Sequence, residues 1–228
     1  MRDRAPRRRR RRTLIALAVP GALALAGIGF LVAGLMAVGS GPPTPAYPEP
    51  VPGARVWAST VRLRPMDRSE PRRIEIPSIG VDASVMPVGL APDGSVGTPP
   101  LSRPQLTGWY RNGRTPGERG SAVILGHVDS YASGRAVFYD LGRLKRGAVI
   151  DVERGDHSVA EFKVDAVSLV PRSRFPVSTV YGPVPYPGLR LVTCAGPFDA
   201  ASGSYRDNIV VFASLVAERT PLLGLLGG

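Results

Sequence analysis

Three side chains of this sequence could take part directly in catalysis: those of its only cysteine, one of its two histidines, and an arginine. Cys194 and His127 each end a short apolar run, and Arg206 stands just before another. A cysteine acts as a nucleophile when a base is near and when donors stabilise the oxyanion that forms. A thiol, an imidazole and a guanidinium at strand ends of one small domain therefore indicate cysteine-dependent acyl transfer.

Each of these residues also has an ordinary structural interpretation. A lone cysteine is often a small buried hydrophobe, an isolated histidine is often structural, and an isolated arginine usually lies on the surface. Thr193 directly precedes the cysteine and is a candidate for positioning substrate or oxyanion donors. Asp129 is a candidate to orient the ring of His127, although a residue two positions along a strand often points elsewhere. His157 falls in a polar run, 153–157, that predicts a hairpin turn facing solvent.

The elements that must position these residues are predicted to be β-strands. From residue 73 onward, short apolar or alternating runs are separated by glycine, proline, aspartate and asparagine. A short helical turn is expected within 136–144, and no helix is long enough for a parallel crossover, so a mostly antiparallel barrel is favoured. The apolar phase flips at Val167 and Leu169, which predicts a bulge or bend. The expected strands are 73–76, 81–88, 107–110, 121–127, 148–153, 158–170, 189–194 and 208–215.

The N-terminal part of the chain has a different character. The net charge of +11 is concentrated there, because eight of the first twelve residues are arginines. No aromatic side chain is interleaved for base stacking, so nucleic acid is not an expected partner. Residues 14–39 carry no charge, and a span needs about 20 apolar residues. We therefore expect a single-pass anchor in the plasma membrane lipid, with the arginines cytoplasmic and the catalytic domain extracellular. Cleavage as a signal peptide after residue 39 is the alternative.

Six prolines in residues 41–52 predict a stiff, extended spacer. The expected organisation is a basic cytoplasmic tail, a transmembrane anchor, a proline-rich and polar linker, and a catalytic domain, over residues 1–13, 14–39, 40–72 and 73–228.

Three segments together resemble the signatures of the sortase family, in the same order along the chain. The resemblance covers about residues 73–216, and the anchor and spacer also fit the family. Several segments resemble the actinobacterial class called class F, although Arg190 stands where the family often has threonine. The signature segments are Gly126-His127, Leu191-Val-Thr-Cys194 and Tyr205-Arg-Asp-Asn-Ile-Val-Val211, and the class F segments are Arg73-Ile-Glu-Ile-Pro-Ser-Ile-Gly-Val81, Gly126-His-Val-Asp-Ser130 and Cys194-Ala-Gly-Pro-Phe-Asp199.

The resemblance implies an all-β, eight-stranded barrel and a membrane-anchored transpeptidase. Such an enzyme cleaves a Leu-Pro-x-Thr-Gly (LPxTG) sorting signal between threonine and glycine through a cysteine thioester. It then transfers the acyl group to an amine, such as that of a peptidoglycan precursor or a pilin lysine. By resemblance, Cys194 is the nucleophile, His127 the acid and then the base, Arg206 the oxyanion partner, and Thr193 a positioning residue.

No cofactor or metal is expected. Some sortases bind calcium through acidic residues in the loop before the cysteine strand, but here that loop, 171–188, contains no aspartate or glutamate. Its five prolines predict a preformed wall instead. Four apolar side chains of the loop are candidates either for a pocket that binds the Leu-Pro segment or for ordinary core packing: Phe175, Val177, Val180 and Tyr181.

Two other functions remain open at the level of sequence. An L,D-transpeptidase or another extracellular Cys-His peptidase would also use this pair of residues, and a stem peptide containing D-amino acids would distinguish the L,D-transpeptidase. A tethered cell-surface binding module is the alternative without catalysis, and it would hold Cys194 as a buried, unreactive thiol.

Overall fold

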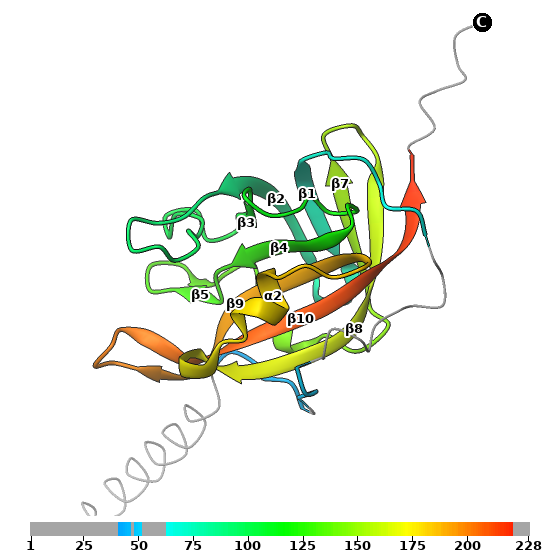
Figure 1. Cartoon of the computed structure of the whole chain (residues 1–228). Helices are drawn as coiled ribbons and strands as arrows, with labels where there is room; N and C mark the ends of the chain where they lie inside the picture. The colour runs from blue at the N-terminus through cyan, green and yellow to red at the C-terminus, as the bar shows by residue number, and fades with distance from the viewer. Residues whose placement is uncertain (1–40, 47, 52–62, 221–228) are drawn as a thin grey trace, which may run out of the picture. The chain divides into compact units, whose positions relative to one another are not determined.

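A computed structural model describes residues 41–46, 48–51 and 63–220 of the chain (Figure 1). Within these residues, no helix has both the length and the apolar character that a membrane span requires. The expected basic tail (1–13) and transmembrane anchor (14–39) lie outside the described residues.

The core of the structure is a closed barrel of eight strands in the order β1-β2-β3-β4-β9-β10-β8-β7 (Figure 1). Neighbours are antiparallel except for β2 with β3 and β4 with β9, which are parallel. The mostly antiparallel eight-stranded barrel expected from the sequence is therefore confirmed. The strands are β1 (Pro71–Ile76), β2 (Val81–Val88), β3 (Thr107–Tyr110), β4 (Gly120–Gly126), β7 (Val149–Arg154), β8 (Val159–Pro171), β9 (Pro187–Asp199) and β10 (Ser204–Arg219).

Smaller elements decorate the barrel. A two-stranded ribbon, β5 (Asp129–Ser130) with β6 (Gly134–Arg135), follows β4 and was not predicted. The expected helical turn within 136–144 is present as the 3-10 helix η2 (Leu141–Arg143). Two further 3-10 helices and one short α-helix are η1 (Pro77–Ile79), η3 (Arg172–Arg174) and α2 (Val177–Tyr181).

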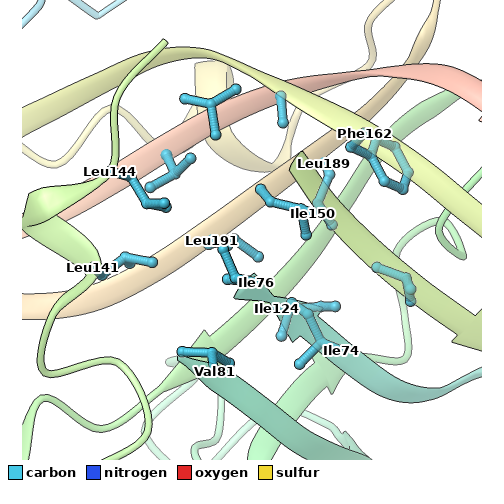
Figure 2. Packing of buried hydrophobic residues seen from close by; sticks show 14 of the residues in the cluster. Ile74, Ile76, Val81, Ile124, Leu141, Leu144, Ile150, Phe162, Leu189 and Leu191 are labelled. Carbon is cyan, nitrogen blue, oxygen red and sulfur yellow. The ribbon is translucent and has the colours of Figure 1, made fainter. Parts of the chain in front are cut away.

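The barrel interior is filled by one large cluster of buried side chains, part of which Figure 2 shows. Alternation along each strand directs every second residue into it. Isoleucines, leucines, valines and two phenylalanines meet there from segments that lie far apart in the sequence. The side chains labelled in the view are Ile74, Ile76, Val81, Ile124, Leu141, Leu144, Ile150, Phe162, Leu189 and Leu191.

A second, smaller cluster lies on the outer face of the sheet beneath α2, where Val180 packs with Val192 of β9 and Phe212 of β10. Strand β8 contributes to both clusters, and a register shift changes which of its residues face the interior. The pairing with β10 passes from Ala166 to Val164 and leaves Asp165 unpaired. Val164 and Val167, three residues apart, consequently both point into the interior cluster, so the alternation of inward-facing residues changes between them. The apolar pattern of the sequence predicted this change.

The chain before β1, which the sequence assigned to the linker, also packs against the barrel. Met66 is buried, and its N–H donates to the carbonyl of Gly117. The buried Arg154 donates to the carbonyl of Asp67. Part of the expected spacer also contacts the domain, where the N–H of Glu49 donates to a carbonyl of β8.

Candidate active site

Strands β4 and β9 place His127 and Cys194 side by side at one end of the barrel. These strands are parallel, and their register runs as far as Leu125 opposite Val192. Two residues further on, His127 follows the end of β4 and Cys194 lies on β9. Leu125 and Val192 both belong to the outer cluster, so alternation directs both candidate residues to the outer face as well. Neighbouring strands lie about 4.8 Å apart, a spacing suited to a thiol and an imidazole that act together.

Thr193 fixes this register from inside the barrel. Its side chain is only 3% exposed, and its Oγ1 donates a 2.8 Å hydrogen bond to the carbonyl of Gly126. The sequence indicated a residue that positions substrate or oxyanion donors. In the structure the hydroxyl joins the cysteine strand to the residue directly before His127.

The His127 ring is partly buried and is held by a loop. Its Nε2 lies 2.7 Å from the carbonyl oxygen of Pro99. A carbonyl only accepts hydrogen bonds, so Nε2 carries a proton, and Nδ1 is the basic nitrogen of the neutral ring. The N–H of Phe138 donates to the backbone carbonyl of His127 and anchors the residue on its other side. These two hydrogen bonds hold the ring and the backbone of His127 in place.

The thiol of Cys194 is exposed but lies among groups that alter its acidity. Desolvation by its surroundings raises the pKa of Cys194 above the ordinary 9.0, Arg172 acts in the opposite direction, and Asp129 raises it further. The uncharged thiol therefore predominates at neutral pH in the free protein. Attack as thiolate requires a proton acceptor or a cation nearby.

Asp129 does not orient His127 but accepts a hydrogen bond from the phenol of Tyr205. Desolvation, followed by this hydrogen bond, raises the pKa of Tyr205. The ring of Tyr205 also meets Phe198 edge to face, with centroids 5.3 Å apart. The contact ties the β5–β6 ribbon to the β9–β10 hairpin beside Cys194, so the carboxylate is held where it acts on the thiol.

Arg206 lies on β10, the other neighbour of the cysteine strand. Asn208 stands directly opposite Cys194, and the register shifts between Tyr205 and Asp207, which places Arg206 at a bulge. Its side chain is exposed and makes no hydrogen bond or ion pair with any residue that the structure describes. The strand registers thus place His127 and Cys194 on neighbouring strands and Arg206 on the strand at the other side of Cys194, two residues from the partner of Cys194.

Sequence reasoning missed Arg172 and Tyr205, which both act on the site. Arg172 follows the last residue of β8, and that residue pairs with Asp207 of β10. Neither residue has a distinctive local signal, because each becomes relevant only through pairing between distant strands. His157, by contrast, is where the sequence placed it, exposed in the turn between β7 and β8 with a φ of 65°.

The loop before the cysteine strand forms a packed wall. Val180 of α2 is completely buried, and Phe175 and Tyr181 pack against the same outer cluster. Val177 alone of the four candidates is strongly exposed, at 61%. Core packing therefore accounts for three of the four apolar residues. Over residues 41–46, 48–51 and 63–220, no group of three or more histidine, cysteine, aspartate or glutamate side chains is arranged to hold a metal ion.

Comparison with known proteins places the chain in a family and matches its fold to solved structures. A family model described as the sortase domain matches residues 74–216. The chain is similar to the solved structure of sortase A from Corynebacterium diphtheriae, with a TM-score of 0.51 and 20% identity over 68% of this chain and 64% of that chain. Sortase C-1 from Actinomyces oris gives a TM-score of 0.50 and 21% identity over 64% of this chain and 73% of that chain. No curated protein sequence gives a significant match.

Proposed function

Because the chain belongs to the sortase family of cysteine transpeptidases, with the family domain spanning residues 74–216, we propose that Cys194 is its nucleophile and His127 its acid and base. The observation that supports this proposal is the parallel pairing of β4 with β9, which ends with Leu125 opposite Val192, two residues before His127 and Cys194 respectively. Membership of this family decides against the L,D-transpeptidase and binding-module alternatives.

The proposed reaction proceeds in two acyl transfers. The Cys194 thiolate attacks the threonine carbonyl of an LPxTG-like sorting signal, and the peptide bond to glycine breaks. The imidazolium of His127 gives its proton to the departing glycine amine, which leaves a thioester on the enzyme. An incoming amine then attacks the thioester while neutral His127 accepts its proton, and the new amide forms as the thiolate departs.

We assign stabilisation of the oxyanion to Arg206. A guanidinium without a hydrogen-bond partner among the described residues, on the strand beside Cys194, is suited to this role because it need not break an existing hydrogen bond to bind the oxyanion. Fixed positive charge at a developing oxyanion is worth several kcal/mol. Arg206→Lys keeps the charge but loses the planar fork, so we expect a large fall in kcat. An unchanged kcat in Arg206→Lys would show that Arg206 is an ordinary surface residue that does not stabilise the oxyanion.

The proposed substrates are proteins that carry an LPxTG-type signal, and the proposed acceptors are amines of peptidoglycan precursors or pilin lysines. We propose that residues 14–39 anchor the chain in the plasma membrane with the domain outside, which brings it to such substrates. The segments 73–81, 126–130 and 194–199 support assignment to class F.

The test uses the full chain in a nonionic detergent with a quenched fluorescent LPxTG peptide. We expect cleavage in the wild type, and formation of a ligated product when oligoglycine or a diaminopimelate-like amine is added. Cys194→Ala should give neither product while its folding remains near that of the wild type. Acceptance of a D-amino-acid stem peptide in place of LPxTG would overturn the proposed specificity.

A further inference from the structure

A cavity of about 600 Å³ lies at the opposite end of the barrel from Cys194. Its lining includes the first residues of β4 and the segment 182–184 before β9. Because β4 and β9 are parallel, their starts share one barrel end and the candidate active site occupies the other. Seven strand residues, at about 3.3 Å each, separate Gly120 from His127 by about 23 Å. The cavity is therefore distinct from the active site.

The lining of this cavity is strongly basic. Four arginines contribute to it, and no aspartate or glutamate does: Arg68, Arg111, Arg114 and Arg119. Just behind the wall, Glu118 lies 3.4 Å from Arg68 and 3.9 Å from Arg114. One carboxylate thus offsets part of four positive charges. Arg111 and Arg119 make no ion pair with any residue in the described part of the chain.

The basic wall is rigid because its loop is bonded at several points. The indole N–H of Trp109 donates to the carbonyl of Arg114 at 2.8 Å. The backbone N–H and hydroxyl of Thr115 both donate to Glu118, at 2.6 and 2.7 Å. The guanidinium of Arg68 lies over the ring of Trp109, 5.7 Å from its centroid. Binding an anion here would therefore require little ordering of the loop.

The wall opposite the arginine-bearing loop includes the uncharged hydroxyl groups of Ser121 and Tyr181. Ser121 Oγ donates to the carbonyl of Gly182 at 3.0 Å, which joins the two walls. Tyr181 also lines the cavity, and its burial raises the pKa of the phenol to about 12. The Tyr181 hydroxyl consequently keeps its proton at physiological pH and can donate to an anionic oxygen beside the guanidinium groups.

We propose that this cavity, which we call the arginine cavity, binds a phosphodiester anion through Arg111 and Arg119. Guanidinium forks match the oxygen geometry of phosphate, and the volume is within the range of ligand pockets, about 300–1,000 Å³. It exceeds the size of one phosphate group, so a phosphodiester with attached polyol fits better than a free inorganic ion. Such groups occur both in soluble polyol phosphate chains and in anionic lipid headgroups.

The test compares two double variants of the full chain in nonionic detergent. Arg111→Gln with Arg119→Gln removes the unpaired arginines of the cavity. Arg64→Gln with Arg72→Gln makes the same charge change at exposed arginines outside it. The N-terminal arginines are identical in both, so their contribution cancels. The soluble probe is an oligomer of glycerol phosphate, and the lipid probe is a short-chain phosphatidylglycerol kept below the concentration at which it forms micelles. Both are measured by calorimetry, so that insertion of residues 14–39 into a bilayer does not contribute.

We expect the cavity variant to bind at least one probe about tenfold more weakly than the wild type, while the control variant binds like the wild type. Loss confined to the glycerol phosphate oligomer identifies a polyol phosphate ligand, and loss confined to the short-chain lipid identifies a lipid headgroup. Equal weakening in both variants, or no binding by the wild type, would overturn the proposal.

A second measurement does not depend on the folding of a variant. Phenylglyoxal modification of the wild type, mapped by mass spectrometry, should show protection of Arg111 and Arg119 by the bound probe. Arg72 should be modified equally with and without the probe. Protection of all three arginines, or of none, would also refute the assignment.

Discussion

Replacing Thr193 with valine tests whether a buried hydroxyl aligns the two catalytic candidates. Valine keeps the shape and the strand preference of threonine but removes the 2.8 Å hydrogen bond to the carbonyl of Gly126. Loss of one partner from a buried hydrogen bond costs about 1–3 kcal/mol. Because domains of this kind are typically stable by about 5–15 kcal/mol, the variant should remain folded. Any fall in its activity therefore reports on the position of His127.

We expect Thr193→Val to lower the free energy of unfolding by about 1–2 kcal/mol in a urea titration. The rate of acyl-enzyme formation in a single turnover should fall by about tenfold, because each 1.4 kcal/mol of lost alignment slows the step by that factor. Thr193→Ser retains the hydroxyl and should stay close to the wild-type acylation rate. A wild-type acylation rate in the valine variant would show that the hydroxyl does not position His127. Equal damage from serine and valine would assign the effect to the lost methyl packing.

The remaining predictions concern acid–base chemistry. His127→Ala should abolish peptide cleavage and His157→Ala should preserve it, because His157 is exposed in a turn; equal losses would mean that the acid–base residue is misassigned. Wild-type kcat/KM should follow a bell-shaped pH profile, since thiolate and imidazolium must coexist; a monotonic profile would contradict that pairing. Arg172→Gln removes a cation that lowers the pKa of Cys194, so the pH midpoint of thiol alkylation should rise. Asp129→Asn removes an anion that raises the pKa of Cys194, so the same midpoint should fall. Midpoints unchanged in both variants would refute this electrostatic account.

Much of the barrel was predictable because each strand has a strong local pattern. The run 121–127 coincides with β4 apart from one residue at each end, and the phase flip near Val167 marks a real change of register in β8. Apolar and polar residues alternate along a strand because one of its faces meets the core, so the pattern can be recognised in the sequence alone. The position of His127 directly after β4 followed from the same signal, whereas β9 continues past Cys194 to Asp199, so the cysteine lies within its strand and not at the expected end.

Features that depend on contacts between distant segments were not predictable. The β5–β6 ribbon has two residues per strand, too few for any alternation. Met66 reads as part of a polar linker, yet it is buried because the loop at Gly117 covers it. Arg172 gains its influence on Cys194 only through the pairing of β8 with β10. The sequence therefore predicts the reacting groups, but it does not predict the charged residues that change the pKa of Cys194.

The most direct test of the account is mass spectrometry of the intact chain after brief mixing with an LPxTG peptide. The account predicts an added mass equal to the peptide fragment that ends at threonine, located on Cys194 and released by an amine acceptor. Cys194→Ala should show no adduct and no cleavage. Full cleavage by Cys194→Ala, or turnover of the wild type through an adduct on another residue, would contradict the assignment of Cys194 as the nucleophile.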